Sequence, residues 1–236
     1  MGKIIFFLCI FSSLSLYSIE RHNFFIFDYS QLKVSCHANS NKDFWEFGQL
    51  GFNSAPEIGS FLVFLKAEYG IQIAIETGTY TGNTTVFLSF LFDRVHTIEY
   101  DENTYHTTRE TLHRYPNIIS HLGSSEVVLS KILPSLEGER LLLYLDAHWY
   151  NFWPLRDEIL VASLTHIDNC ILVIDDFKVP HRNEIPYDKY GVHECSYEYI
   201  KEQLDVLYSD YITYYLIPKN PHQRAKFVVI PKEWKN

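Results

Sequence analysis

Blocks of apolar and polar residues alternate along the chain, and beyond residue 55 they follow a regular order of helix and strand. Positions 55–69 carry apolar residues at helical spacing, and Gly70 follows them, which predicts a helix that ends there. Short runs of apolar and β-branched residues come next, separated by segments with helical spacing. The runs predict strands at 71–76, 95–100, 117–122, 141–145 and 170–174, and the segments between them predict helices at 81–92, 103–115, 124–136 and 151–165.

The pattern changes near the end of the chain. Residues 195–208 repeat the helical spacing, and two more apolar runs, 211–217 and 226–230, predict strands. Only PKNPHQRA separates these strands, which is too short for a crossover helix, so we expect an antiparallel hairpin. Continuous apolar strands separated by helices are typical of a parallel sheet covered on both faces. The sequence therefore predicts an α/β fold with a Rossmann-like, doubly wound seven-stranded sheet, mostly parallel with an antiparallel last strand.

The first 54 residues do not follow this order. Lys3 precedes a mostly apolar run that reaches Ser18, the pattern of a secretory signal peptide with small residues near its cleavage point. The alternatives for residues 1–18 are an uncleaved anchor, which would associate the chain with a membrane, and a strand or helix packed on the domain. Residues 19–54 predict irregular structure or short helices that cover one edge, and residues 55–236 form the predicted main domain.

Composition and charge narrow the classes of partner. The 236 residues are 47% hydrophobic and 16% aromatic, which is enough for one domain with a sizeable core. The formal net charge is −9 and no basic run is present, which argues against nucleic acid, since phosphate binding needs clustered Lys and Arg. None of the four cysteines falls in a Cys-x-x-Cys pair, so neither a structural zinc site nor a disulfide scaffold is predicted.

Polar residues follow all five of the parallel strands. In an open α/β sheet, ligands bind at the carboxyl ends of the strands, near the point where strand order reverses. Several of the predicted strands end in acid, which is hard to attribute to chance, although acids also begin solvated loops. The strand-end residues are Glu76 with Gly78, Glu99, Gly123 with Ser124 and Ser125, Asp146 with His148, and Asp175 with Asp176.

The stretch from 71 to 101 suits a nucleotide-like cofactor. Gly78 and Gly82 allow the loop backbone to approach a ligand closely, and the next helix presents free N–H groups. Glu99, at the end of the second strand, can accept hydrogen bonds from both hydroxyls of a ribose. The alternatives are a solvated carboxylate at Glu99 and, for residues 123–125, a simple helix cap.

Asp146, Asp175 and Asp176 would converge if the fourth and fifth strands are neighbours. Three carboxylates form a hard oxygen site that suits Mg²⁺ or Ca²⁺. The alternative is that Asp175 or Asp176 caps the following turn. His148 could act as a general base, pack against an adenine ring, or serve as a partly buried hydrogen-bonding side chain. The nearby aromatic residues are typical of a core or of the wall of an acceptor pocket: Trp149, Tyr150, Phe152 and Trp153.

The element order and five motifs together resemble the class I S-adenosylmethionine-dependent methyltransferases. Within that family the chain is most similar to the metal-dependent small-molecule O-methyltransferases of the catechol O-methyltransferase type. The resemblance runs from about residue 55 to the C-terminus and implies the same seven-stranded sheet. The motifs are ETGTYTGNTT (76–85), VHTIEYD (95–101), HLGSSEVVL (121–129), LLLYLDAHW (141–149) and ILVIDDF (171–177).

The resemblance also implies roles for individual residues. It implies that the methionine part of S-adenosylmethionine contacts Glu76, Gly78, Tyr80 and Gly82. It also implies that the ribose contacts Glu99, and that the adenine contacts Tyr100, Gly123 and Ser125. Asp146 belongs to both the cofactor site and the reaction centre, which it shares with His148 as the catalytic pair. The metal ligands implied for Mg²⁺ are Asp146, Asp175 and Asp176.

Two departures from the family pattern concern the reaction centre. The catalytic lysine of the family is absent, and Tyr150 stands at the nearest position. Ala147 is inserted between Asp146 and His148. Both departures affect the catechol-like mechanism more than cofactor binding. A metal that lowers the pKa of an acceptor hydroxyl would compensate for the missing lysine.

The function predicted from these observations is S-adenosylmethionine-dependent O-methylation of a small-molecule or sugar-like acceptor, with metal assistance. The alternatives are an NAD-type oxidoreductase, which shares the loop and Glu99 but lacks the third glycine, and a non-catalytic Rossmann-like binding protein that is exported or membrane-tethered. The N-terminal segment indicates export or anchoring, whereas the cytosolic supply of S-adenosylmethionine favours the cytoplasm. The sequence does not specify the acceptor or the oligomeric state.

Overall fold

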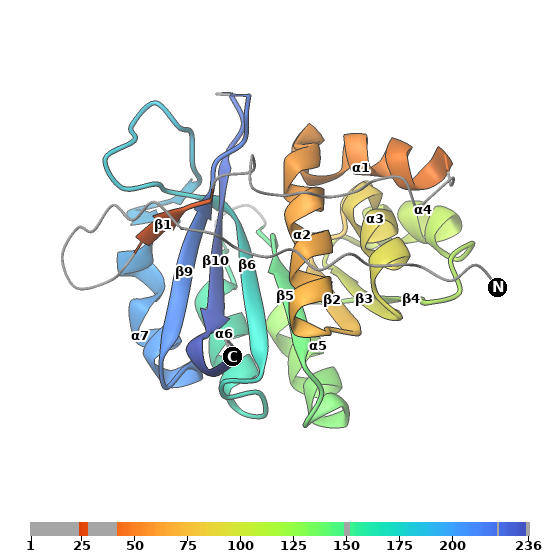
Figure 1. Ribbon diagram of the computed structural model, residues 1–236. Helices are drawn as coiled ribbons and strands as arrows, with labels where there is room; N and C mark the ends of the chain where they lie inside the picture. Colours follow the sequence, from red (N-terminus) through yellow and green to blue (C-terminus); the bar gives the residue numbers. More distant parts are fainter. Residues whose placement is uncertain (1–23, 28–41, 149–151, 221, 235–236) are drawn as a thin grey trace.

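The computed structural model describes residues 24–27, 42–148, 152–220 and 222–234. Its main feature is one twisted eight-stranded sheet in the order β1-β9-β10-β6-β5-β2-β3-β4 (Figure 1). The strands are β1 (Phe24–Ile26), β2 (Ile73–Thr77), β3 (Arg94–Glu99), β4 (Ile118–Leu122), β5 (Leu141–Leu145), β6 (Cys170–Phe177), β9 (Tyr211–Leu216) and β10 (Ala225–Pro231). Neighbouring strands pair in parallel except for β10, which is antiparallel to both β6 and β9. The predicted sheet and its terminal hairpin are confirmed.

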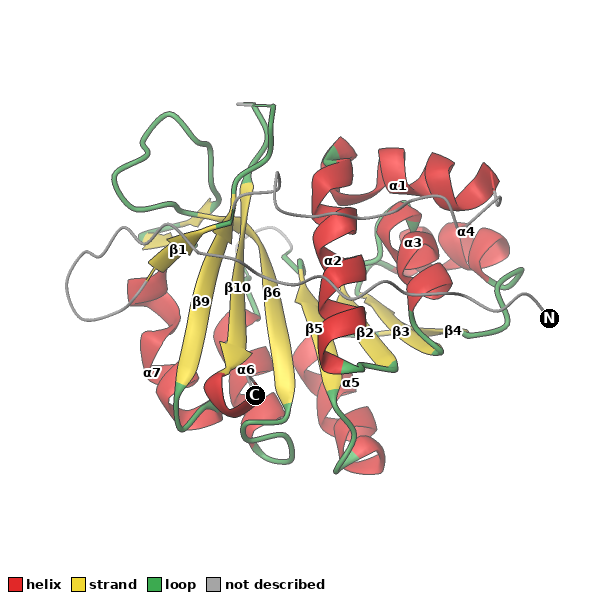
Figure 2. Ribbon diagram, in the orientation of Figure 1, coloured by secondary structure: helices red, strands yellow, loops and turns green. Residues whose placement is uncertain are grey.

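Helices cover both faces of the sheet (Figure 2). The helices are α1 (Lys42–Ser54), α2 (Pro56–Tyr69), α3 (Asn83–Leu91), α4 (Glu102–Leu112), α5 (Ser125–Ile132), α6 (Leu155–Ser163) and α7 (Tyr197–Leu207), with the 3₁₀ turns η3 (Leu133–Leu136) and η4 (Lys232–Trp234). Buried side chains of α1, α2 and α3 pack with one set of strand residues, and those of α5, α6 and α7 pack with the other. Successive strand residues point to opposite faces, so a strand buried on both sides is apolar throughout.

Several element boundaries differ from the prediction for identifiable reasons. The helix predicted at 124–136 divides into α5 and η3, because Pro134 has no N–H for the helical ladder. The helix predicted at 151–165 begins at Leu155, after Pro154, while residue 151 lies outside the described residues. Strand β6 continues three residues past the predicted end at 174, because Ala225 of β10 pairs with Phe177.

The segment before residue 55 contributes more regular structure than predicted. β1 adds a short parallel strand beside β9, and α1 packs against α3. The predicted signal peptide or anchor, residues 1–18, lies outside the described residues. Within the described ranges, no helix is long and apolar enough to cross a membrane. The loop after β6 contains a further small hairpin of β7 (Lys189–Tyr190) and β8 (His193–Glu194).

The topology sets the place of the site. From β2 the chain continues to β3 and β4 on one side, and it then crosses to β5 and β6 on the other. Strand order therefore reverses between β2 and β5. The carboxyl ends of these strands meet along one edge of the sheet, where open α/β sheets bind their ligands.

Candidate functional site

The loop after β2 is held close to the end of β5 by its glycines. Gly78 has a φ of +85°, and a Cβ at this position would lie 2.5 Å from the carbonyl oxygen of Asp146. Gly82 has a φ of +76° and precedes α3, where a Cβ would lie 2.8 Å from Thr108. Only glycine combines this backbone conformation with such close packing. The predicted role of these glycines in shaping a tight loop is consistent with this geometry.

Glu99 fastens the same loop to the end of β3. One carboxylate oxygen accepts a hydrogen bond from the backbone N–H of Tyr80 at 2.9 Å. The other accepts one from the backbone N–H of Asp101, also at 2.9 Å. Tyr80 itself has a φ of +46° and a side chain that is 73% exposed, and Tyr100 follows Glu99 with its ring half exposed. The predicted ribose ligand therefore also organises the loop through two backbone contacts.

Glu76 does not lie on the open side of the loop. It is 1% exposed in β2, and its carboxylate accepts hydrogen bonds from Thr85 of α3 and, at 2.7 Å, from Thr97 of β3. Burial raises the pKa of Glu76 to about 7. Its carboxylate joins β2, α3 and β3 beneath the glycine loop, so the structure gives it a supporting position rather than direct access to a ligand from the loop side.

The end of β4 meets the buried Glu158 of α6. Gly123 has a φ of +145° and donates its N–H to the carbonyl of Glu99 at 2.8 Å. Ser125, at the start of α5, is 1% exposed. Glu158 is also 1% exposed, and burial raises its pKa to about 7 against the lowering influence of the Ser125 and Thr77 hydroxyls.

Sequence reasoning did not identify Glu158. A signal was present, because Glu158 follows Leu155 by three residues and precedes Ala162 by four, which places it on the buried face of its helix. A carboxylate on such a face needs a specific reason to be there.

A pocket opens between the ends of β5 and β6 and the loop that follows β6. The loop carries the β7–β8 hairpin and brings Asp188 and Tyr190 over the strand ends. Acidic and aromatic side chains dominate the wall. The lining residues are Leu145, Asp146, Ala147, His148, Trp153, Leu155, Glu158, Ile174, Asp175, Asp176, Asp188, Tyr190 and Cys195.

Asp175, one of the three predicted metal ligands, is engaged elsewhere. Lys226 of β10, itself 1% exposed, forms a buried ion pair with one of its oxygens. The same oxygen accepts the backbone N–H of Asp176, and the other accepts the hydroxyl of Tyr144 at 2.7 Å. Burial opposes ionisation of Asp175, but the charge of Lys226 and these hydrogen bonds lower its pKa. Both of its oxygens face protein donors rather than the predicted metal.

Asp176 has one engaged oxygen and one free oxygen. Its backbone has a φ of +57°, and one carboxylate oxygen lies 2.6 Å from Arg224. The other oxygen is buried and has no hydrogen-bond partner among the described residues. Burial, and then the charge of Asp175, raise the pKa of Asp176 to about 8.

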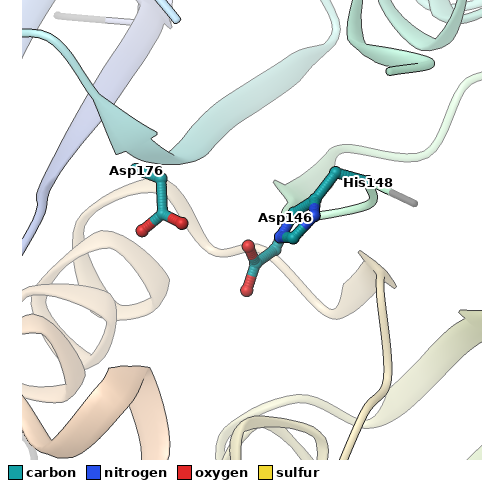
Figure 3. Close-up of side chains that lie close together, drawn as sticks. All are labelled: Asp146, His148 and Asp176. Carbon is teal, nitrogen blue, oxygen red and sulfur yellow. The ribbon is translucent and has the colours of Figure 1, made fainter. Parts of the chain in front are cut away.

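Asp146 and His148 come from the end of β5 and lie beside Asp176 (Figure 3). One ligand atom from each of the three side chains can be chosen so that all lie within 4.8 Å of one another. Burial, and then the charges of Asp175 and Asp176, raise the pKa of Asp146 well above its usual range. The predicted reaction-centre pair is thus grouped with Asp176.

Asp188 links this group to the covering loop. One of its oxygens lies 3.9 Å from Nε2 of His148 and accepts the hydroxyl of Tyr190 at 2.9 Å. The other lies 2.8 Å from Arg224, which also contacts Asp176. The Tyr190 ring stands next to the His148 ring, with 5.4 Å between their centroids.

Sequence reasoning did not identify Asp188, Arg224 or Lys226. The first two lie in segments without a recognisable spacing. Lys226 did carry a signal, because a lysine within the apolar run AKFVVIP breaks the pattern of a buried strand. Of the predicted aromatic cluster, Trp149 and Tyr150 lie outside the described residues, whereas Trp153 lines the pocket.

Comparisons with known proteins support the fold. No protein-family model matches the chain, and no curated protein matches its sequence. Among solved structures, the O-methyltransferase TomG from Streptomyces achromogenes, in complex with S-adenosylmethionine, has a TM-score of 0.56 at 16% identity, covering 81% of this chain and 89% of its own. An O-methyltransferase from Bacillus cereus, in complex with S-adenosylhomocysteine, has a TM-score of 0.55 at 15% identity, covering 81% and 92%.

A third similar structure is that of a putative O-methyltransferase from Klebsiella pneumoniae, with a TM-score of 0.54 at 14% identity, covering 80% of this chain and 86% of its own. At these identities the likeness concerns the fold. The predicted Rossmann-like sheet, mostly parallel with antiparallel pairing of its last strand, is therefore confirmed as the fold that these O-methyltransferases share.

Proposed function

We propose that the chain is an S-adenosylmethionine-dependent methyltransferase that acts on a hydroxyl of a small molecule. The observation that carries the proposal is the glycine loop, held by Gly78 against the end of β5 and by Glu99 against the end of β3, directly beside a pocket that contains Asp146 and His148. Two structures with the same fold were solved with S-adenosylmethionine or S-adenosylhomocysteine bound.

The residues present fit this cofactor. Each oxygen of Glu99 accepts one backbone N–H, and a carboxylate oxygen has a second lone pair that can accept a ribose hydroxyl. The exposed Tyr100 stands beside it for the adenine, with Gly123 and Ser125 bordering the same side, and Asp146 lies where the pocket begins. When bound, the cofactor supplies a methyl group on a sulfonium centre. Gly78 and Gly82 let the loop pack closely against the end of β5 and against α4, which sets where the cofactor would lie.

The role of Glu76 is revised within this proposal. Its carboxylate holds β2, α3 and β3 together through Thr85 and Thr97. We expect it to set the height of the loop from beneath, rather than to contact the methionine part of the cofactor. Tyr80 remains a candidate for that contact because its ring is exposed.

On the acceptor side, His148 is the residue that can accept a proton from a hydroxyl. Its side chain is 42% exposed, and one oxygen of Asp188 stands 3.9 Å from its Nε2, so the ring is open to an acceptor with a carboxylate beside it. Trp153 and Tyr190 supply flat apolar surface along the pocket.

The predicted Mg²⁺ ligand set of Asp146, Asp175 and Asp176 does not fit, because Lys226 and Tyr144 engage Asp175. The proposed chemistry therefore does not depend on Mg²⁺ bound by these three aspartates.

Calorimetry with S-adenosylhomocysteine tests the proposal. The unaltered chain should bind it, and Glu99→Ala should weaken binding roughly tenfold to a hundredfold, because one charge-assisted hydrogen bond contributes about 1.5–3 kcal/mol. Glu102→Ala, a neighbouring exposed acid in the first turn of α4, is the control and should leave affinity unchanged.

Absence of binding by the folded chain at millimolar ligand would overturn the proposal. NADH binding in its place would favour the oxidoreductase alternative. Binding of neither compound would favour a non-catalytic role.

A further inference from the structure

The pocket contains a set of metal ligands different from the one that the sequence predicts. We propose that Asp146, His148 and Asp176 bind a divalent transition-metal ion, and that Asp175 takes no part. With an ion bound, His148 would serve as its ligand, and the ion would take over from the ring the task of lowering the pKa of the acceptor hydroxyl. That contribution rests on the proposed function, but metal binding itself is measurable without it.

Asp175 is excluded from the proposed metal site because protein groups already engage both of its oxygens. Lys226 is buried against it and carries the positive charge that a metal would otherwise supply. Tyr144 and the backbone N–H of Asp176 complete its contacts. Recruiting Asp175 to a metal would leave the ammonium of Lys226 buried without its partner, which is strongly unfavourable.

The ligand atoms available to an ion are carboxylate oxygens of Asp176 and Asp146. The side chain of Asp176 is only 8% exposed, and one of its oxygens is buried without a hydrogen-bond partner. No protein donor among the described residues contacts the Asp146 carboxylate. A buried carboxylate oxygen that lacks a partner is costly, and an ion in this position would remove that cost.

The spacing of the three side chains is close to that of a bound ion. Their candidate ligand atoms lie within 4.8 Å of one another. Three ligands at about 2.1 Å from one ion lie roughly 3.0–3.6 Å apart. Closing the group therefore requires the separations to shrink by up to about 1–2 Å. Rotation of side chains can supply this, and the half-exposed ring of His148 has the most freedom to move.

The surroundings resemble the outer shell of a metal site. A ligating histidine usually donates its second ring N–H to a carboxylate, and Asp188 stands in that position at 3.9 Å from Nε2 of His148. Arg224 fixes the engaged oxygen of Asp176 and one oxygen of Asp188. These contacts orient both ligands from outside the cluster.

The charge balance of the group points to a divalent cation. Four aspartates, Asp146, Asp175, Asp176 and Asp188, contribute four negative charges when ionised. Among the described residues, Lys226 and Arg224 form ion pairs with members of this group and contribute two positive charges. Two negative charges remain when all four are ionised.

The donor set also indicates the class of ion. Mg²⁺ favours carboxylate, carbonyl and water oxygens, whereas an imidazole ligand suits Mn²⁺, Fe²⁺, Co²⁺ or Zn²⁺ better. Two carboxylates and one imidazole therefore favour a transition metal over Mg²⁺.

Metal titration of the full chain, made without a histidine tag and freed of metal with a chelator, tests the proposal. Calorimetry should give one equivalent of Mn²⁺ or Zn²⁺ bound at least tenfold more tightly than Mg²⁺. With Co²⁺, the visible absorption spectrum should report a nitrogen ligand. His148→Ala should lose that spectrum and weaken Mn²⁺ binding at least tenfold, while His106→Ala, an exposed histidine of α4, should change neither.

Two further variants separate this site from the all-oxygen site. Asp176→Ala removes the ligand oxygen and should abolish binding. The double variant Asp175→Asn with Lys226→Met removes both members of the buried pair and should still bind Mn²⁺. The proposal is overturned if the folded chain binds no divalent ion, or if Mg²⁺ binds as tightly as Mn²⁺ and His148→Ala has no effect. Either result leaves S-adenosylhomocysteine binding as a separate measurement, so the proposed methyltransferase function can still stand.

Discussion

At the scale of the residue, backbone conformation and a close contact act together at Gly78. Its φ of +85° is strained for any residue with a side chain, and the carbonyl oxygen of Asp146 occupies the space that a Cβ would take. Gly138 provides a useful comparison, because it has a φ of +89° but no atom within 4 Å of its Cβ position. The contact, rather than the dihedral angle, distinguishes the loop that the ligand is expected to approach.

Replacing Gly78 by alanine should therefore have two effects. The strain should lower the free energy of unfolding by about 1–3 kcal/mol. The loop should also move away from the end of β5, so affinity for S-adenosylhomocysteine should fall at least tenfold. Urea unfolding and calorimetry measure the two quantities. Gly138→Ala introduces similar backbone strain, but its Cβ would touch no neighbouring atom, so this variant should keep full affinity. Equal behaviour of the two variants would show that the Asp146 contact has no role.

At the scale of the element, hydrophobic periodicity predicted the strands well, because strands buried on both faces are apolar throughout. Helix ends were predicted less well where proline sets the boundary, as at Pro134 and Pro154. The three residues of β1 depend on pairing with β9, about 190 residues later, and a run that short has no periodicity of its own. The extension of β6 similarly depends on its partner β10.

The pairing of β6 with β10 contains the buried Lys226–Asp175 ion pair. Lys226→Met should leave a buried, unpaired carboxylate and lower the free energy of unfolding by about 3–5 kcal/mol. Adding Asp175→Asn removes that charge while keeping an acceptor for Tyr144, so the double variant should recover at least half of the loss. Urea denaturation of the four members of this cycle gives the coupling energy. A single-variant loss below about 1 kcal/mol would mean that the pair is not desolvated as it is in the structure.

At the scale of the whole molecule, the site is assembled from segments that the sequence keeps far apart. Strand-end position alone placed Asp146 beside Asp176 and put Glu99 at the same edge of the sheet, because parallel strands end at one edge. It did not place Asp188 or Lys226, which reach the pocket through a loop and an antiparallel strand whose registers depend on tertiary contacts. Partners such as these decide whether a carboxylate is free to bind a ligand, and sequence spacing does not reveal them.

The same assembly makes the stability of the whole molecule depend on pH through Glu158, where α6 meets α5 and β2. Its pKa is raised from 4.5 to about 7 by burial, so the folded chain holds a proton that the unfolded chain releases. This contribution to stability is fully present below pH 4.5 and is lost as the pH rises through 7. The shift corresponds to about 3 kcal/mol.

Glu158→Gln stays neutral at every pH, so its stability relative to the unaltered chain should rise by up to about 3 kcal/mol between pH 5 and pH 8. Urea unfolding at several pH values measures the difference, and Glu76, whose pKa is also raised, is common to both proteins and cancels. Glu110→Gln, at an exposed acid of α4, is the control, and its difference from the unaltered chain should not change over this range. A constant difference for Glu158→Gln across the range would show that Glu158 is already ionised in the folded chain and that burial does not raise its pKa as expected.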